Sequence, residues 1–393
     1  MSTRKARSSP RHQGRSSTSS ACHPSGNLAR PIRARTADPV APAQYLSNLK
    51  RAKEPIMSKQ TYKRIVLASR PEAAVTPDNF RIEELPVPEL ADGQVLVRNH
   101  FLSLDPYMRG RMSDSKSYAD PQPLNEVMIG GTVGEVIASK NPKWNVGDKV
   151  IGMFGWQELG VSDGGMMQKV DTTHIPLSAY LGSVGMPGVT AWYGLNKIIA
   201  PKAGETVVVS AASGAVGSVV GQLAKLAGCY VVGVAGGKEK CDYVVNELGF
   251  DACVDYKAAK DAKELYAMVK AVTPNGIDGY FENVGGDILD VVLSRLNPFA
   301  RIAVCGLIAG YDGQDMPIRN PRAILVARAK IEGFIVSEHM ELWPQALREL
   351  GTYVAQGKIK FRESIAEGLA SAPEAFIGLL KGKNFGKQLV KLA

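Results

Sequence analysis

The chain has 393 residues, with 47 Lys or Arg, 38 Asp or Glu and a formal net charge of +9. The excess lies in residues 1–56, which hold 11 basic and two acidic residues, so the 337 residues from Met57 onward carry 36 of each. A neutral body produces no field that would steer it onto a polyanion, so we expect no nucleic acid partner for the folded part. No apolar run reaches the ~18 residues of a membrane-spanning helix, and we expect no membrane segment.

Residues 1–57 are rich in Ser, Arg, Pro and Ala and nearly lack acidic residues, which predicts a disordered basic N-terminal extension. The same composition is typical of an organellar transit peptide, and basic tails also bind nucleic acid. Prolines at positions 31, 39 and 42 interrupt any amphipathic helix here. We therefore favour a third interpretation, in which Met57 is the natural start and the preceding residues are a translated upstream segment.

Short β-rich segments separated by Pro and Gly follow, and they predict an antiparallel, barrel-like domain over residues 58–182. In chain order, the predicted strands lie within residues 62–69, 79–88, 94–105, 127–139, 147–155 and 165–171.

Beyond Gly182 the pattern changes. A predicted helix over residues 186–198 is followed by apolar β-rich runs that alternate with longer helical runs, which favours a doubly wound parallel sheet with helices on both faces over residues 183–345. A helix over 343–359 and a strand over 385–392 close the chain. We expect residues 346–393 to return to the first domain and complete it, which makes the fold class α/β.

The segment Ala212-x-Gly214-x-x-Gly217 joins the apolar strand 206–210 to a helix, as a dinucleotide-binding fingerprint requires. Gly214 lets the backbone approach a pyrophosphate, Gly217 lets the helix pack closely on the strand, and the helix N-terminus faces the phosphate with free N–H groups. The alternative is a Gly-rich turn of any α/β protein. The complete βαβ pattern around this segment favours the nucleotide.

The end of the next strand indicates which nucleotide is bound. An NAD enzyme usually has an acidic residue there on the ribose 2′-hydroxyl. This chain instead has Gly236 and Gly237, followed by Lys238 and Lys240. Lys240, helped by Lys238, supplies positive charge for a 2′-phosphate, so we infer NADPH over NADH. The alternative is that these lysines belong to a solvated helix face.

Two turn-prone segments that follow strands, residues 105–109 and 305–311, are candidates for the chemistry. Each carries a tyrosine, Tyr107 or Tyr311, whose hydroxyl can donate to a carbonyl oxygen and stabilise an enolate; packing alone is the alternative. Tyr256 and Lys260 match the spacing of the catalytic pair of short-chain dehydrogenases. Because they follow the third strand of the predicted sheet, we interpret the match as coincidence.

The sequence predicts no metal site, because it has no C-x-x-C pair and the histidines of the body lack partners at zinc-ligand spacing. These histidines are His100, His174 and His339. We expect the body's cysteines to be reduced packing residues of a cytoplasmic protein. They are Cys229, Cys241, Cys253 and Cys305.

Residues 85–99, 130–152 and 211–229 resemble the zinc-free branch of the medium-chain dehydrogenase/reductase superfamily. Five further motifs narrow the resemblance to the prostaglandin/leukotriene reductases, the plant double-bond reductases and the bacterial NADPH-dependent curcumin reductases. They are LSLDPYMRGRM, AGGKEK, ENVGG, GFIV and LLKGKNFGK.

The resemblance implies a Rossmann domain beside a GroES-like, partly open β-barrel catalytic domain. It implies NADPH-dependent reduction of the carbon–carbon double bond of α,β-unsaturated ketones and aldehydes by hydride transfer to the β-carbon, in a homodimer that takes a small-molecule enone or alkenal. The main alternative on the same fold is an NADPH-dependent quinone oxidoreductase. An NADPH-binding protein without turnover is a third interpretation.

The resemblance also assigns residues to the cofactor and the substrate. For the cofactor it implies Gly214, Ala215, Val216 and Gly217 at the pyrophosphate, Lys240 and Tyr256 at the 2′-phosphate, Asn283 alongside, Cys305, Gly306, Leu307, Ile308 and Tyr311 near the nicotinamide, Phe334, Ile335 and Val336 flanking it, and Asn384 from the closing segment. Tyr107 and Tyr311 are implied on the substrate side.

Overall fold

The computed structural model describes residues 61–393. The predicted extension, residues 1–57, lies outside this part of the chain. None of the helices between residues 61 and 393 is long and apolar enough to cross a membrane.

A mainly antiparallel sheet of seven strands takes most of its strands from the first half of this region. Five of them are β3 (Val95–Ser103), β4 (Thr132–Ser139), β5 (Lys149–Gly152), β6 (Leu159–Ser162) and β7 (Met167–Lys169). A separate hairpin pairs β1 (Thr61–Leu67) with β2 (Phe80–Pro86). Each predicted strand segment contains a strand, whereas β6 was not predicted. It has four residues, and Gly160 and the following Asp-Gly-Gly leave it without an alternating apolar pattern.

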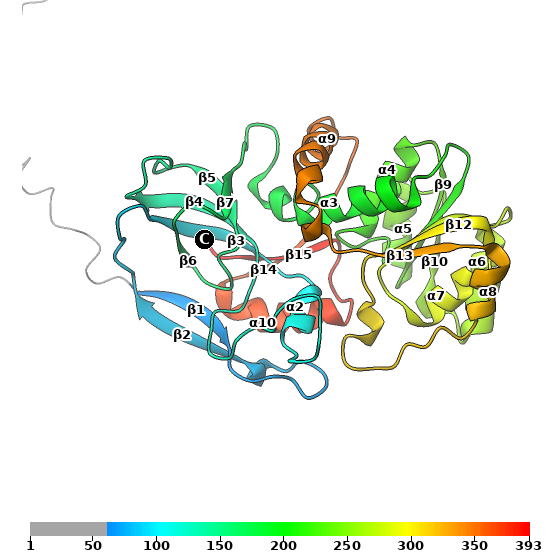
Figure 1. The fold of residues 1–393 in the computed structure, drawn as a ribbon, viewed down its shortest axis with the longest axis horizontal. Coiled ribbons are helices and arrows are strands. Elements are labelled where there is room, and N and C mark those ends of the chain that lie inside the picture. The colour runs from blue at the N-terminus through cyan, green and yellow to red at the C-terminus, as the bar shows by residue number, and fades with distance from the viewer. Residues whose placement is uncertain (1–60) are drawn as a thin grey trace, which may run out of the picture. The chain divides into compact units, whose positions relative to one another are not determined.

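The remaining two strands of this sheet come from the end of the chain: β14 (Glu363–Glu367) and β15 (Lys387–Lys391). Strand β15 pairs antiparallel with β3, with Leu389 opposite Ser103, and lies in red beside β3 in Figure 1. Helix α10 (Ala372–Leu380) precedes it and places Phe376 edge-on against the fully buried Trp156. The closing segment therefore contributes both a strand and core side chains to the first part of the fold.

The second sheet has six parallel strands in the order β10-β9-β8-β11-β12-β13. Their bounds are β8 (Thr206–Ser210), β9 (Tyr230–Ala235), β10 (Ala252–Asp255), β11 (Ile277–Glu282), β12 (Leu296–Val304) and β13 (Lys330–Gly333). From β8 the chain adds strands in one direction (β9, β10), and from β11 it adds strands in the opposite direction (β12, β13), as in a Rossmann fold. The predicted α/β fold class, with a doubly wound sheet and a GroES-like barrel sheet, is confirmed.

Helices cover both faces of this parallel sheet (Figure 1). They are α3 (Met186–Tyr193), which continues as a π-helix over Gly194–Ile199, α4 (Gly217–Leu226), α5 (Lys238–Asn246), α6 (Ala262–Val272), α7 (Gly286–Leu293) and α8 (Pro321–Ala327). Helix α9 (Trp343–Ala355) packs against α3. Alternate β8 residues face opposite ways. Val207 and Val209 join the core cluster of α4, while Val208 joins that of α6 and α7. Burial on both faces explains the unbroken apolar runs of these strands.

The predicted boundaries near residues 182 and 345 stay predictions, because residues 61–393 belong to a single compact unit.

Candidate active site

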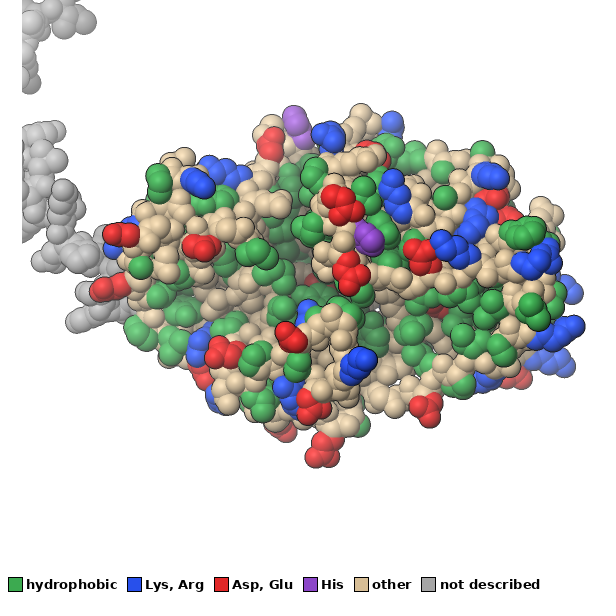
Figure 2. All heavy atoms as spheres, in the orientation of Figure 1, with side chains coloured by type: hydrophobic (Ala, Val, Ile, Leu, Met, Phe, Trp, Pro, Cys, Tyr) green, Lys and Arg blue, Asp and Glu red, His purple; other side chains and the backbone are tan. Residues whose placement is uncertain are grey.

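A cavity of about 1340 Å³ lies at the carboxyl ends of β8, β9, β11 and β12, where the strand order of the parallel sheet reverses. In open α/β sheets this position is where ligands bind. Its other wall comes from the antiparallel sheet, from helix α2 (Tyr107–Arg111) and from the closing segment. Figure 2 shows a hollow with apolar side chains between that sheet and α9.

Every site residue that the resemblance assigns, except one, lines this cavity. The exception is Leu307, whose Cδ2 atom lies 3.3 Å from where a Cβ of Gly285 would be, behind the loop of residues 305–311. The side chain of Leu307 therefore lies against the turn at Gly285. The structure therefore does not bring Leu307 to the cavity wall.

The fingerprint turn is built as its sequence predicts. A Cβ on Gly217 would lie 2.4 Å from the carbonyl oxygen of Ala211, so only glycine lets α4 start this close to β8. Ala211 itself adopts a left-handed conformation with φ of 49°. Gly214 also forms a β-bridge with Gly386, which joins the turn directly to the closing segment that carries Asn384.

Two lysines, Lys240 and Lys257, line the cavity end next to Gly236. Lys240 Nζ donates a 2.7 Å hydrogen bond to the carbonyl oxygen of Gly382, and burial and the charge of Lys257 lower its pKa below the usual value. Lys238 does not line the cavity; its side chain is 84% exposed and pairs with Asp242. Residues 238 and 240 point in nearly opposite directions on a helix, which explains why only one faces the cavity.

Lys257 was not predicted at this site. The sequence predicted Lys238 instead as the second positive charge for a 2′-phosphate. The available signal was that Lys257 directly follows Tyr256, at the end of the strand next to β9. A Cβ on Gly236 would lie 2.9 Å from both Lys257 Cε and the Tyr256 ring, so glycine leaves these side chains the room they use.

Five tyrosines line the cavity: Tyr107, Tyr118 and Tyr311 from three separate segments, together with Tyr180 and with Tyr256 beside the lysines. Burial raises the pKa of Tyr311 to about 12, with a smaller contribution from the Cys305 thiol. The pKa of Tyr107 is raised well above its usual value, mainly by burial and further by the Asp105 carboxylate. Both hydroxyls therefore stay protonated donors at neutral pH.

Tyr118 was not predicted, because it lies in a polar loop with no strand before it. Its pKa is raised, first by burial, although the Arg111 guanidinium 5.6 Å from its ring centroid acts in the opposite direction.

A buried carboxylate fixes the strand ends beneath the cavity. Glu282 is fully buried and accepts hydrogen bonds from the hydroxyls of Ser210 (2.8 Å) and Tyr280 (2.7 Å). The next residue, Asn283, donates from its side chain to the carbonyl oxygen of Ser210 at 2.8 Å. These bonds tie the end of β11 to the end of β8. Asn283 is thereby held in the cavity wall.

The loop after β12 begins with Cys305, whose backbone N–H donates to the Glu282 carbonyl oxygen at 2.9 Å. Burial, together with the Glu282 carboxylate, raises the pKa of this thiol to about 12. The Tyr311 hydroxyl lies 3.3 Å from where a Cβ of Gly306 would be, over the backbone of the same loop.

Two other features of the described residues bear on the sequence predictions. Residues 61–393 contain no cluster of three or more His, Cys, Asp or Glu side chains arranged to hold a metal ion, and the predicted absence of zinc stays a prediction. Tyr256 lies in a 3₁₀ turn over residues 256–258, whereas Lys260 precedes helix α6. The two residues do not share a helix, as the short-chain dehydrogenase pair must.

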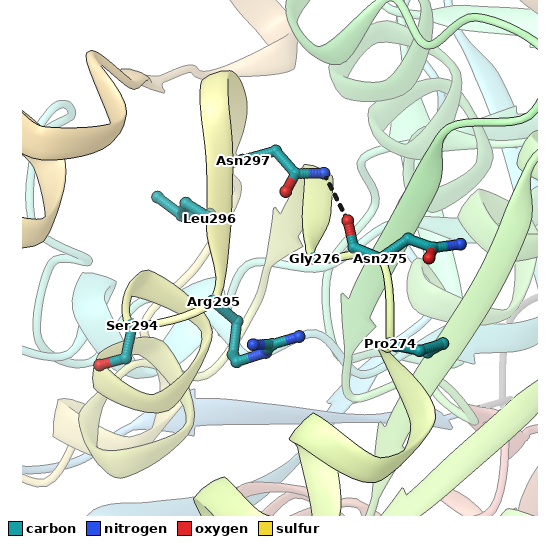
Figure 3. A pocket seen from close by; sticks show the side chains of 7 residues that line it. All are labelled: Pro274, Asn275, Gly276, Ser294, Arg295, Leu296 and Asn297. Atoms are coloured by element: carbon teal, nitrogen blue, oxygen red, sulfur yellow. Dashed lines mark hydrogen bonds between the residues drawn. The ribbon is translucent and has the colours of Figure 1, made fainter.

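A second depression, of about 360 Å³, lies at the amino ends of β11 and β12 (Figure 3). Two of its polar side chains already have partners: Asn297 donates to the Asn275 carbonyl oxygen at 2.9 Å, and the Arg295 guanidinium donates to the Thr273 carbonyl oxygen. It is at the end of the sheet opposite to the one where α/β proteins bind ligands. We do not assign it a function.

Known proteins match this chain over nearly its whole described length. Residues 63–170 match the family model described as the N-terminal domain of oxidoreductase, and residues 215–352 match the one described as zinc-binding dehydrogenase. The chain is 48% identical to the NADPH-dependent curcumin reductase of Escherichia coli over 342 residues, which are 85% of this chain and 98% of that protein. The chain belongs to the prostaglandin and double-bond reductase family of the medium-chain dehydrogenase/reductases.

Two further members of this family are similar throughout. A 2-alkenal reductase (NADP(+)-dependent) of Nicotiana tabacum is 44% identical over 79% of this chain and 90% of its own. The crystal structure of CurA from Vibrio vulnificus in complex with NADPH superposes with a TM-score of 0.79 at 47% identity, over 84% of this chain and 99% of that one.

Proposed function

We propose that this protein reduces the carbon–carbon double bond of α,β-unsaturated ketones and aldehydes with NADPH, in the manner of its curcumin and 2-alkenal reductase relatives. The observation that carries this proposal is that Tyr107 and Tyr311 both line the cavity that the fingerprint turn also lines. The two tyrosines lie in segments that follow β3 and β12, strands of different sheets. Their hydroxyls supply neutral hydrogen-bond donors where an enolate oxygen develops charge.

The residues present fit NADPH. Gly214 and Gly217 leave the backbone of the turn open to a pyrophosphate, and Lys240 and Lys257 supply positive charge at the far end of the cavity, next to Gly236. When bound there, NADPH supplies a hydride.

The chain's own residues then act on the substrate. Tyr311, and with it Tyr107, donates to the carbonyl oxygen and stabilises the enolate that forms as the β-carbon accepts hydride. The raised pKa of each hydroxyl keeps its proton in place for this role. Water or a tyrosine hydroxyl delivers the proton to the α-carbon, which completes the reduction.

The test is a screen of enones and enals for NADPH oxidation by the wild-type enzyme, Tyr311→Phe and Tyr107→Phe. We expect Tyr311→Phe to lower kcat by about 10²- to 10³-fold while the Kd for NADPH stays unchanged. Tyr230→Phe is the matched control, because Tyr230 is at the start of β9 and does not line the cavity. An unchanged kcat for Tyr311→Phe would remove this residue as the enolate donor.

The same assay separates the alternatives. Benzoquinones tested beside the enones identify a quinone oxidoreductase, which would prefer the quinones. NADPH oxidation that never depends on an added acceptor would favour a binding protein without turnover.

We also infer a homodimer joined through β13, the edge strand of the six-stranded sheet. Apolar side chains are exposed at and beside this edge: Phe299 (66%), Leu325 (76%), Val326 (53%) and Ile331 (37%). Sedimentation of the wild type and of Leu325→Lys tests it, with a dimer expected only for the wild type. A cytoplasmic location is part of this proposal, and fractionation of the host cell tests it.

A further inference from the structure

Two thiols meet between helix α5 and strand β10, and one of them follows Lys240 directly in the sequence. Cys241 is in the first turns of α5 and Cys253 is in β10, and the Sγ of Cys253 donates a hydrogen bond to the Sγ of Cys241 at 3.1 Å. A disulfide bond is about 2.05 Å long, so the sulfurs are roughly 1 Å from bonding distance. The other two described cysteines lack such a partner. Cys229 contacts a backbone carbonyl oxygen, that of Lys202, and Cys305 lines the cavity.

We propose that Cys241 and Cys253 form a reversible disulfide when the protein meets a hydroperoxide, and that this bond weakens NADPH binding through Lys240. The first half rests on the contact between the two sulfurs. The second half rests on the proposed function, because it assumes that Lys240 contacts NADPH.

The hydrogen bond also makes the two thiols unequal. The pKa of Cys241 is lowered, because Cys253 donates to its sulfur; burial and the carboxylates of Asp255 and Asp242 act in the opposite direction. The pKa of Cys253 is raised by the same hydrogen bond and by burial. Cys241 is therefore the nucleophile of the pair, since the thiolate is the reactive form.

The chemistry balances with a hydroperoxide as the oxidant. The Cys241 thiolate attacks the terminal oxygen of the O–O bond, forms a sulfenic acid and releases an alcohol, or water when the oxidant is hydrogen peroxide. The Cys253 sulfur then attacks the sulfenic sulfur, loses its proton and displaces water. The two thiols together give up two electrons, and the hydroperoxide takes them.

The coupling to the cofactor follows from the position of Lys240, one residue before Cys241. The start of α5 is tied to the end of β10 by a 2.7 Å hydrogen bond from the Gly237 N–H to the Asp255 carboxylate. Drawing Cys241 toward β10 shifts the turn that holds Lys240, whose ammonium group is placed by its 2.7 Å bond to the Gly382 carbonyl oxygen. A displaced lysine at this end weakens a charge-assisted contact to a 2′-phosphate.

The test for the disulfide is mass spectrometry of the full-length protein after hydrogen peroxide treatment and alkylation of the remaining thiols. We expect a peptide that links residues 241 and 253, lost on reduction with dithiothreitol. Cys229→Ala is the matched control and keeps the linked peptide, whereas Cys241→Ala and Cys253→Ala lack it. Oxidation of Cys241 only to sulfinic or sulfonic acid, without the linked peptide, would overturn the proposal.

Fluorescence titration with NADPH tests the coupling. We expect the Kd to rise by about tenfold in the oxidised wild type and to return on reduction. Cys253→Ala, treated in the same way, should bind NADPH equally well before and after peroxide. An unchanged Kd in a fully cross-linked wild type would overturn the coupling. A reduced protein that fails to bind NADPH would contradict the proposed function instead, and the linked peptide would still decide the disulfide.

Discussion

The ammonium group of Lys387 in β15 donates to the carboxylate of Asp105 at 2.8 Å and to the carbonyl oxygen of Leu104 at 2.7 Å. Both charged residues are buried, with exposures of 4% and 5%, and the Ser103 hydroxyl donates to the second carboxylate oxygen. The last strand of the chain thus holds the start of the loop that presents Tyr107. This ion pair spans 282 positions of sequence.

Lys387→Met is expected to lower the free energy of unfolding by about 3–5 kcal/mol, because it leaves the Asp105 carboxylate buried without its cationic partner. Urea unfolding measures this. The double variant Lys387→Met/Asp105→Leu should recover most of the loss, since both charges are then absent. Lys391→Met, which removes an exposed lysine 3.9 Å from Glu367, is the control and should cost less than about 1 kcal/mol. A double variant no more stable than Lys387→Met would contradict this prediction.

The raised pKa of Tyr311, about 12, predicts the pH dependence of enone reduction. A tyrosine in water loses its proton near pH 10. Because the pKa of Tyr311 is raised, its hydroxyl remains a donor until the pH approaches 12, so its ionisation should not lower kcat between pH 7 and about 10. Measuring kcat across this range in the wild type and Tyr311→Phe checks the point. A loss of activity with a midpoint near pH 10 in the wild type alone would show that the hydroxyl has an ordinary pKa.

Lys240→Gln is expected to lower the preference for NADPH over NADH by about 10- to 100-fold, the range for one hydrogen bond to a charged group. The measured quantity is the ratio of kcat/KM for the two cofactors. Lys238→Gln is the matched control on the same helix, because Lys238 pairs with Asp242 outside the cavity. This control should leave the ratio nearly unchanged. Equal effects of the two substitutions would indicate general electrostatic attraction rather than a contact.

Cys305 lines the cavity that we propose for electrophilic enones, and its reactivity is predicted by its pKa of about 12. A free cysteine has a pKa near 8.5, so the thiolate fraction of Cys305 at pH 7 is roughly 10³-fold smaller. Iodoacetamide labelling followed by peptide mapping should show slow alkylation of this thiol, rising about tenfold per pH unit through pH 11. Labelling at pH 7 as fast as that of a free cysteine would contradict the prediction.

Local patterns were sufficient for much of this fold. The apolar runs of the parallel strands and the fingerprint at Gly214 and Gly217 depend on residues close in sequence, so the Rossmann part could be predicted in chain order. The segments that were not predicted are short: β6 and β14 have four and five residues, and α2, α8 and α10 have five, seven and nine. A segment of this length has too few positions to establish a period, and its partners in the sheet stabilise it instead.

The candidate site likewise has some features that the sequence predicted and others that it did not. The sequence by itself determined which side chains lie at the carboxyl ends of the parallel strands. These side chains share one site because the carboxyl ends of parallel strands meet at one edge of the sheet. Only the tertiary structure decided that Lys257 rather than Lys238 shares the cavity with Lys240, that Tyr118 and Tyr180 join the predicted tyrosines, and that Leu307 does not line the cavity. It also decided the pairs Lys387–Asp105 and Cys241–Cys253. The physical reason is that side-chain direction and contacts between distant segments come from packing, which no local period encodes.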